Sequence, residues 1–126
     1  MKKRTLTRRA FLSRTAAAAA TVTILPRHVF AGPNDKLNIA CVGVGGKGAG
    51  DVGGVSSEHI VALCDVDFNK GKGSFNRHPQ APRYKDFRYM LAELGDKIDA
   101  VTVSTPDHMH FAVAAMAMSM GKHVFV

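Results

Sequence analysis

Four short apolar runs, separated by more polar stretches, dominate the hydrophobicity pattern after the first 35 residues. They cover residues 37–44, 59–65, 98–104 and 123–126. Their length, their β-branched residues and the glycine or acidic residues near their ends predict strands rather than helices. Because hydrophobicity within each run is continuous rather than alternating, we expect both faces of each strand to be covered, as in a parallel sheet.

Helices are predicted between these strands. The expected helical segments are residues 46–56, 67–76, 86–94 and 105–120. The third has apolar residues at helical spacing and is followed by Gly95, which should stop it. In the fourth, Thr105, Pro106 and Asp107 are expected to supply an N-cap, a first-turn proline and an acid that suits the helix dipole. Gly121 should end that helix.

The order of these elements predicts the fold class. Gly71 and Gly73 weaken the helix at 67–76, which should be short, and prolines predict a loop over residues 78–82. The remaining chain alternates strand and helix, which requires right-handed crossovers. We therefore predict an α/β fold with a doubly wound parallel sheet of the Rossmann type.

The positive charge of the chain is concentrated at its beginning. The net charge is +7, and residues 1–31 hold seven of the 17 lysines and arginines but none of the ten acids. The remainder is therefore neutral. Nucleic acid is excluded as a partner, because its binding requires a basic surface on the folded domain.

Residues 1–31 have the three parts of an export signal. A basic head ends in TRRAFL, an alanine-rich stretch covers residues 15–25, and small residues follow at 29–31. The apolar stretch is too short to cross about 30 Å of hydrocarbon, so no stable membrane anchor is predicted. Arg8 and Arg9 favour the twin-arginine route over an ordinary Sec signal, the open alternative. We expect a signal peptide at 1–31, a domain at 32–126 and a periplasmic or otherwise exported protein.

A glycine cluster follows the first predicted strand. Gly43, Val44, Gly45, Gly46, Lys47 and Gly48 fit the pattern G-x-G-x-x-G between a strand and a helix. In that pattern the first glycine permits a tight turn, the second lets backbone approach a diphosphate, and the third permits close packing of helix on strand. Lys47 is a candidate phosphate ligand, although a solvated lysine is the alternative. A glycine turn without any ligand is the alternative for the motif as a whole.

Asp65 supplies the second half of the dinucleotide pattern. It ends the strand at 59–65 and stands 22 positions after Gly43, where an acid accepts hydrogen bonds from the adenosine ribose. The carboxylate would repel a 2′-phosphate, and no arginine follows it closely. The sequence therefore predicts NAD, rather than NADP, as the cofactor.

Four stretches together resemble one family, the Gfo/Idh/MocA oxidoreductases. They are KLNIACVGVGGKGAGDV, VALCDVD, RYKDFRYML and DAVTVSTPDHMHFAVAAMAMSMGKHVFV. The resemblance implies that Ser104, Thr105 and Pro106 lie near the cofactor, with His110 close to the same loop. It also implies NAD-dependent hydride transfer to or from a sugar or polyol, and a homo-oligomer when the protein is full length.

The chain departs from the family at its last residue. In the family the final strand continues into a Glu-Lys-Pro motif, whose lysine is implied in proton transfer, and then into a second α/β domain. This sequence stops at Val126, so we expect an incomplete domain and assign it no catalytic residue. Two alternatives stay open: a glycosidase of the same superfamily that uses NAD, and a nucleotide-binding fragment without catalysis.

Metal binding and a disulfide are both considered and set aside. His108 and His110 are two positions apart on a predicted helix and would point to nearly opposite sides, so no metal site is predicted. Cys41 and Cys64 fall inside apolar strands, and we expect buried thiols rather than a disulfide.

Overall fold

The computed structural model describes residues 35–126. The predicted signal peptide at 1–31, and with it the start of the predicted domain, lies outside the described residues. The strands are β1 (Asn38–Val42), β2 (His59–Cys64), β3 (Arg83–Tyr84), β4 (Ala100–Val103) and β5 (His123–Phe125). The helices are α2 (Gly48–Gly54), α3 (Lys72–Arg77), α4 (Phe87–Leu94), the 3-10 turn η2 (Gly95–Lys97) and α5 (Asp107–Ser119).

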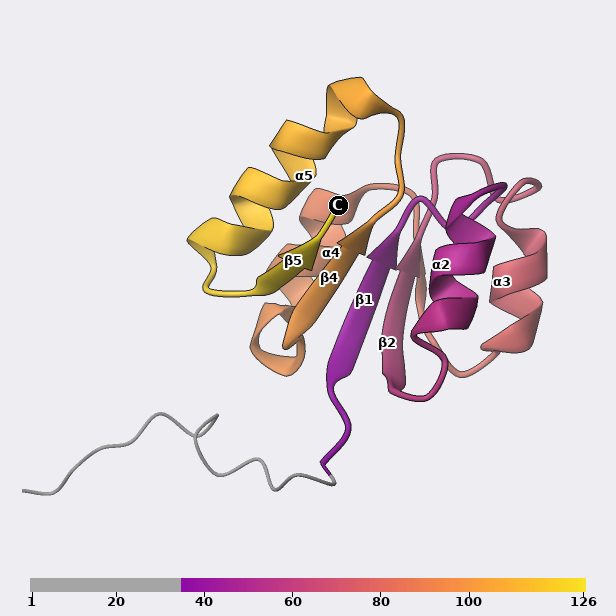
Figure 1. Ribbon diagram of the computed structural model, residues 1–126, viewed down its shortest axis with the longest axis horizontal. Coiled ribbons are helices and arrows are strands. Elements are labelled where there is room, and N and C mark those ends of the chain that lie inside the picture. The colour runs from indigo at the N-terminus through magenta and orange to yellow at the C-terminus, as the bar shows by residue number, and fades with distance from the viewer. Residues whose placement is uncertain (1–34) are drawn as a thin grey trace, which may run out of the picture. The chain divides into compact units, whose positions relative to one another are not determined.

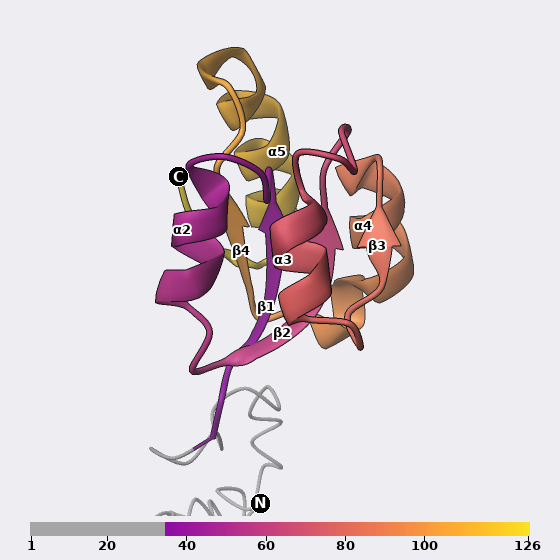
Figure 2. The same ribbon diagram turned by 90° about the vertical axis from the view of Figure 1, so that its right-hand side faces the viewer.

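The five strands form one parallel sheet in the order β3-β2-β1-β4-β5. Figures 1 and 2 show α2 and α3 on one face of this sheet and α4 and α5 on the other. The chain therefore winds outward from β1 in both directions. The predicted doubly wound parallel sheet is confirmed.

Alternate residues of each central strand enter different cores. Ala40 and Val42 of β1 pack in the cluster beneath α4 and α5, whereas Ile39 and Cys41 pack in the cluster beneath α2 and α3. All four are buried, which explains why the strand is apolar without alternation. Cys64 lies in the first of these clusters and Cys41 in the second, so the two buried thiols occupy opposite faces of the sheet.

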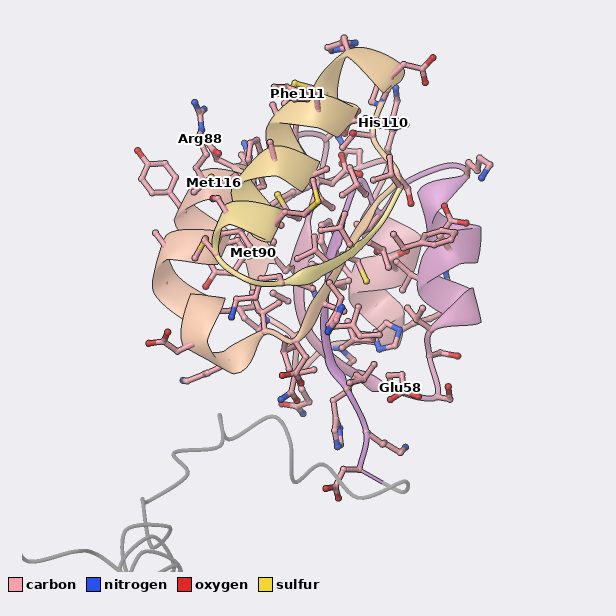
Figure 3. The ribbon with its side chains drawn as sticks, turned by 60° about the vertical axis from the view of Figure 1, so that its left-hand side comes forward. Glu58, Arg88, Met90, His110, Phe111 and Met116 are labelled. Atoms are coloured by element: carbon pink, nitrogen blue, oxygen red, sulfur yellow. The ribbon has the colours of Figure 1, made fainter. Side chains whose placement is uncertain are left out.

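After its first turn, helix α5 carries only apolar residues from Phe111 to Met118. Met116 packs against the cluster that contains Met90 of α4, whereas Phe111 points outward and is 83% exposed (Figure 3). No helix among residues 35–126 is long and apolar enough to cross a membrane.

Several predicted boundaries need correction. The helix expected at 67–76 begins only at Lys72, because the Asp67 carboxylate accepts hydrogen bonds from the amides of Asn69 and Lys70 and holds a turn there. The helix α4 ends at Leu94 with Gly95 at its C-cap, as predicted, but Gly95 also begins a short 3-10 turn that was not expected. Strand β3, two residues long, directly follows the predicted loop and was not expected.

The start of α5 also differs from the prediction. Pro106, not Thr105, occupies the N-cap position, and no side chain caps the helix. At the other end, Gly121 adopts a φ of 73° just after the helix, so its predicted role as terminator is confirmed.

Candidate functional site

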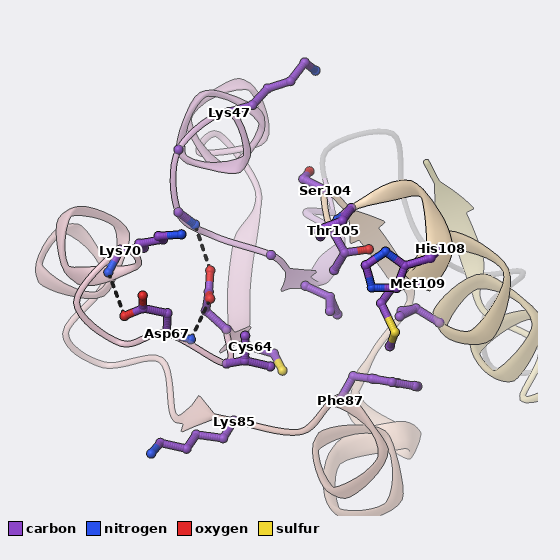
Figure 4. Close-up of a pocket in the computed structure, with 18 residues that line it drawn as sticks. Lys47, Cys64, Asp67, Lys70, Lys85, Phe87, Ser104, Thr105, His108 and Met109 are labelled. Atoms are coloured by element: carbon purple, nitrogen blue, oxygen red, sulfur yellow. Dashed lines mark hydrogen bonds between the residues drawn. The ribbon is translucent and has the colours of Figure 1, made fainter.

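A cavity of about 640 Å³ opens at the carboxyl end of the sheet. Its walls come from the loops that follow β1, β2 and β4, together with Lys85 and Phe87 next to β3 (Figure 4). The strand order reverses between β1 and β4, and the loops after these two strands diverge to opposite faces of the sheet. Such a switch point is where doubly wound sheets bind ligands.

The loop after β1, residues 43–48, is termed the glycine loop. Gly43 has a φ of 80°, and a Cβ there would lie 2.7 Å from the backbone carbon of Ser104. A Cβ on Gly48 would meet the carbonyl oxygen of Gly43 at an impossible distance. Both positions therefore require glycine, because backbone occupies the space that a side chain would need.

Gly45 serves a purpose that the sequence motif did not predict. A Cβ on Gly45 would lie 2.9 Å from the carbonyl carbon of Lys70, so the loop after β2 occupies the space that a side chain at position 45 would need. Gly46, with a φ of 54°, faces open space instead. Within residues 35–126 the N–H groups of Gly46 and Lys47 donate to no other group. These two amides are the free donors of the glycine loop.

Asp65 joins the end of β2 to the glycine loop. Its Oδ2 accepts hydrogen bonds from the amides of Val44 and Gly45, each at 2.9 Å, and its Oδ1 accepts one from Asp67 N at 2.9 Å. The carboxylate also lines the cavity. Two sequence-predicted elements, 20 residues apart, are thus in direct contact, and Oδ1 retains acceptor capacity for a ligand.

The residues predicted after β4 divide between the cavity wall and its support. Ser104, Thr105 and Pro106 line the cavity, whereas His110 lies behind the loop, with Nε2 2.6 Å from the carbonyl oxygen of Thr105. The Thr105 hydroxyl oxygen is buried and has no hydrogen-bond partner among the described residues. An unpaired buried hydroxyl in a cavity wall suits a polar ligand atom.

Lys47 contributes backbone rather than charge to the site. Figure 4 shows its side chain pointing away from the cavity, and that side chain is 91% exposed. Its ammonium lies 3.9 Å from the Asp51 carboxylate, a contact of little energetic value at such exposure.

Sequence reasoning did not assign several residues that line the cavity. They are Cys64, Asp67, Lys70, Lys85, His108 and Met109. Asp67 and Lys70 follow β2 closely, so the strand-end rule could have indicated them. Lys85 stands 20 residues after Asp65, and nothing in the local pattern indicates its place in the wall.

Cys64 gives the floor of the cavity a neutral, apolar character. Burial, reinforced by the negative charges of Asp65 and Asp86, raises the pKa of the Cys64 thiol to about 12. The thiol is therefore protonated near neutral pH and packs as a small hydrophobe.

The observed geometry fits a dinucleotide. Gly43 and Gly48 lie where a larger side chain would meet backbone, the amides of Gly46 and Lys47 have no acceptor among residues 35–126, and a fixed carboxylate and an unpaired hydroxyl line the same cavity. Together with the doubly wound sheet, these features define the class: a Rossmann domain of the dinucleotide-binding type.

Comparison with known proteins identifies the family. The profile of the GFO_IDH_MocA oxidoreductase family, described as having an NAD-binding Rossmann fold, matches residues 37–126. The chain belongs to this family, as the resemblance in its sequence implied.

Relatives carry two kinds of name. A glycosyl hydrolase family 109 protein of Solibacter usitatus is 34% identical over 75% of this chain and 24% of its own length. Inositol 2-dehydrogenase 1 of Saccharopolyspora erythraea is 31% identical over 70% of this chain and 27% of its own length. The chain thus spans about a quarter of the length of these relatives.

Solved structures give the same result for the fold. A dehydrogenase from Chromobacterium violaceum superposes with a TM-score of 0.63 at 26% identity, over 73% of this chain and 28% of that one. Myo-inositol 2-dehydrogenase from Lactobacillus plantarum gives a TM-score of 0.63 at 25% identity. That superposition covers 72% of this chain and 27% of the dehydrogenase.

Proposed function

We propose that this chain is the dinucleotide-binding part of an exported, NAD-dependent oxidoreductase that acts on a sugar or polyol by hydride transfer. The observation that supports it best is the contact of Asp65 with the glycine loop, which unites both halves of the dinucleotide pattern in one cavity. The family's NAD-binding fold and the inositol dehydrogenase among its relatives support the same conclusion.

The chain's own groups match the parts of a dinucleotide. The free amides of Gly46 and Lys47 suit the diphosphate, because unpaired N–H groups bind anions. Asp65 Oδ1 has capacity to accept from ribose hydroxyls, and the unpaired Thr105 hydroxyl suits a polar group further along the cofactor. When bound, the nicotinamide would supply the hydride acceptor or donor.

Proton transfer lies outside what this chain is proposed to do. His108 lines the cavity, but no assigned role depends on it, and the family resemblance places the proton-transferring lysine beyond Val126. The residues of this chain are therefore proposed to bind the cofactor, and none of them is assigned a catalytic role. The longer protein is proposed to form a homo-oligomer, as its family resemblance implies.

Direct titration tests this proposal. Isothermal titration of the 126-residue chain with NAD⁺ should give saturable binding at one site, and Asp65→Ala should abolish or strongly weaken it. Absence of saturable binding to the folded wild-type chain would overturn the proposal.

A second function is favoured by a specific observation. Glycosyl hydrolase family 109 proteins are among the relatives, at up to 34% identity. Such an enzyme would use bound NAD for transient oxidation and re-reduction without net turnover of the cofactor. A version extended beyond Val126 would distinguish the two: net NADH formation with sugar alcohols supports the dehydrogenase, and nitrophenol release from a glycoside without net NADH supports the glycosidase.

Export is proposed from the sequence of residues 1–31. The paired Arg8 and Arg9 favour the twin-arginine route, which carries folded proteins and would therefore deliver the cofactor already bound. Fusion of residues 1–31 to a reporter that functions only outside the cytoplasm tests this. Lysine at both arginine positions should block export by the twin-arginine route and leave Sec export intact.

A further inference from the structure

Asp51, on α2, contacts the walls of the cavity without lining it. Its Oδ2 accepts a hydrogen bond of 2.7 Å from the Ser104 hydroxyl, across 53 positions of sequence. Its Oδ1 lies 3.9 Å from the ammonium of Lys47. We propose that Asp51 is a positioning residue that holds the loop of residues 104–106 against the glycine loop and thereby sets the shape of the cofactor site. This inference rests on the proposed function.

Ser104 lies in close contact with the end of β1 and the glycine loop. Its amide donates to the carbonyl of Val42 at 2.8 Å, and its backbone fills the space beside Gly43. A Cβ on Gly48 would lie 3.0 Å from the Ser104 Cβ. Ser104 is thus packed between the end of β1 and the start of α2. Among the described residues, the hydrogen bond from the Ser104 hydroxyl to the Asp51 carboxylate links α2 to the 104–106 loop through side chains.

This bond also determines which hydroxyl can serve the ligand. Ser104 has one hydroxyl proton and donates it to Asp51, so toward a ligand it can only accept. Thr105, the next residue, has a buried hydroxyl without a partner, which can both donate and accept. Loss of Asp51 would free the Ser104 hydroxyl and allow the loop that carries Thr105 to move.

The ion pair between Lys47 and Asp51 is not the main interaction of the Asp51 carboxylate. The lysine side chain is 91% exposed, and a surface ion pair at 3.9 Å contributes little. A hydrogen bond from a hydroxyl to a partly buried carboxylate is charge-assisted and stronger. The role of Asp51 is therefore assigned to its bond with Ser104.

The two ends of the cofactor provide a selective test. AMP can occupy the end near Asp65 and the glycine loop, whereas NAD⁺ also reaches the 104–106 loop. Removal of the Asp51–Ser104 bond by Asp51→Ala should weaken NAD⁺ binding about tenfold but AMP binding less than about twofold. Asp51→Asn keeps an acceptor oxygen and should restore NAD⁺ affinity to within about threefold of wild type. Asp96→Ala, an exposed acid away from the cavity, is the matched control.

A double-mutant cycle separates positioning from general destabilisation. Ser104→Ala should reproduce the NAD⁺-selective loss, and combination with Asp51→Ala should weaken binding no further, because both variants remove the same bond. Additive losses, or equal losses for NAD⁺ and AMP, would overturn the inference. If Asp51→Ala fails to fold, the other two variants still test the positioning role. Asp51→Asn should retain NAD⁺ affinity, and Ser104→Ala should lose NAD⁺ affinity selectively.

Hydrogen exchange of the unliganded chain provides a readout that is independent of the cofactor. The backbone amides of Ser104 and Thr105 should exchange faster in Asp51→Ala than in wild type, whereas those of β2 should not change. Unchanged exchange at these two amides would overturn the positioning role. Failure of the wild-type chain to bind either nucleotide would instead overturn the proposed function, so the two failures can be distinguished.

Discussion

Asp65 accepts a hydrogen bond of 2.9 Å from the backbone amide of Gly45. The same carboxylate oxygen accepts the amide of Val44, and the other accepts Asp67 N. The acid expected to hold the ribose therefore also holds the glycine loop in shape. The shape of the loop, and the ribose binding that we propose, therefore depend on the same side chain.

Asp65→Ala should destabilise the fold as well as weaken binding. The substitution leaves three amides without their carboxylate partner, and each unsatisfied donor costs about 1 kcal/mol or more. We expect a loss of about 2–4 kcal/mol in the free energy of unfolding, measured by urea denaturation. Asp96→Ala, at an exposed acid, should change stability by less than about 0.5 kcal/mol. Equal effects of the two variants would show that the Asp65 bonds do not support the loop.

Substitution by alanine should have opposite effects on stability at two glycines that are five residues apart. Gly45→Ala places a methyl group 2.9 Å from the backbone of Lys70, and we expect a loss of about 2 kcal/mol. Gly50 lies within α2, and a Cβ there meets nothing within 4 Å, so Gly50→Ala should stabilise by about 0.5–1 kcal/mol. Thermal melting of both variants measures the contrast. Equal tolerance of both substitutions would contradict the close approach of the two loops.

The stability contribution of the Cys64 thiol should fall as pH rises. Burial and the nearby carboxylates raise its pKa to about 12 in the folded chain, whereas an unfolded cysteine titrates near about 8.5. The contribution is fully present below about pH 8.5 and is lost progressively as pH approaches 12.

Cys64→Ala isolates this effect from other groups that titrate in the same range. The wild-type advantage in unfolding free energy over Cys64→Ala, measured in reducing buffer, should shrink by about 2 kcal/mol between about pH 7.5 and pH 10. A constant difference would show that the folded thiol ionises normally. The corresponding difference for Gly50→Ala, which removes no titratable group, should be independent of pH.

Discrimination between NAD and NADP should depend on the fixed charge of Asp65. Its three amide bonds prevent the carboxylate from rotating away from a 2′-phosphate, although Lys70 and Lys85 also line the cavity. We expect NAD⁺ to bind at least about tenfold more tightly than NADP⁺. Asp65→Ser should reduce the ratio of NAD⁺ affinity to NADP⁺ affinity. Lys70→Gln should weaken the binding of NADP⁺ more than that of NAD⁺. Tighter binding of NADP⁺ by wild type would refute the cofactor preference.

The central strands could be predicted from sequence because burial of both faces leaves a continuous apolar run. Gly43 and Gly48 also behave as their motif predicts, since each meets backbone where a side chain would be. Strand β3 was not predicted, because a strand of two residues is too short to show a periodic pattern of hydrophobic positions.

The details of the site depend on tertiary contacts that sequence spacing does not reveal. Gly45 was expected to let backbone approach a diphosphate, and the structure adds a second reason for glycine, because Lys70 fills the space where its Cβ would lie. Thr105 was expected to cap α5, yet its hydroxyl is unpaired in the cavity wall. The bond from Ser104 to Asp51 joins residues of two separate elements, so no local pattern could indicate it.

A crystal structure of the chain grown with NAD⁺ tests the central claim most directly. We expect the diphosphate against the amides of Gly46 and Lys47, with an adenosine ribose hydroxyl bonded to Asp65. A glycine loop without nucleotide in crystals where NAD⁺ is bound elsewhere on the chain would contradict the account.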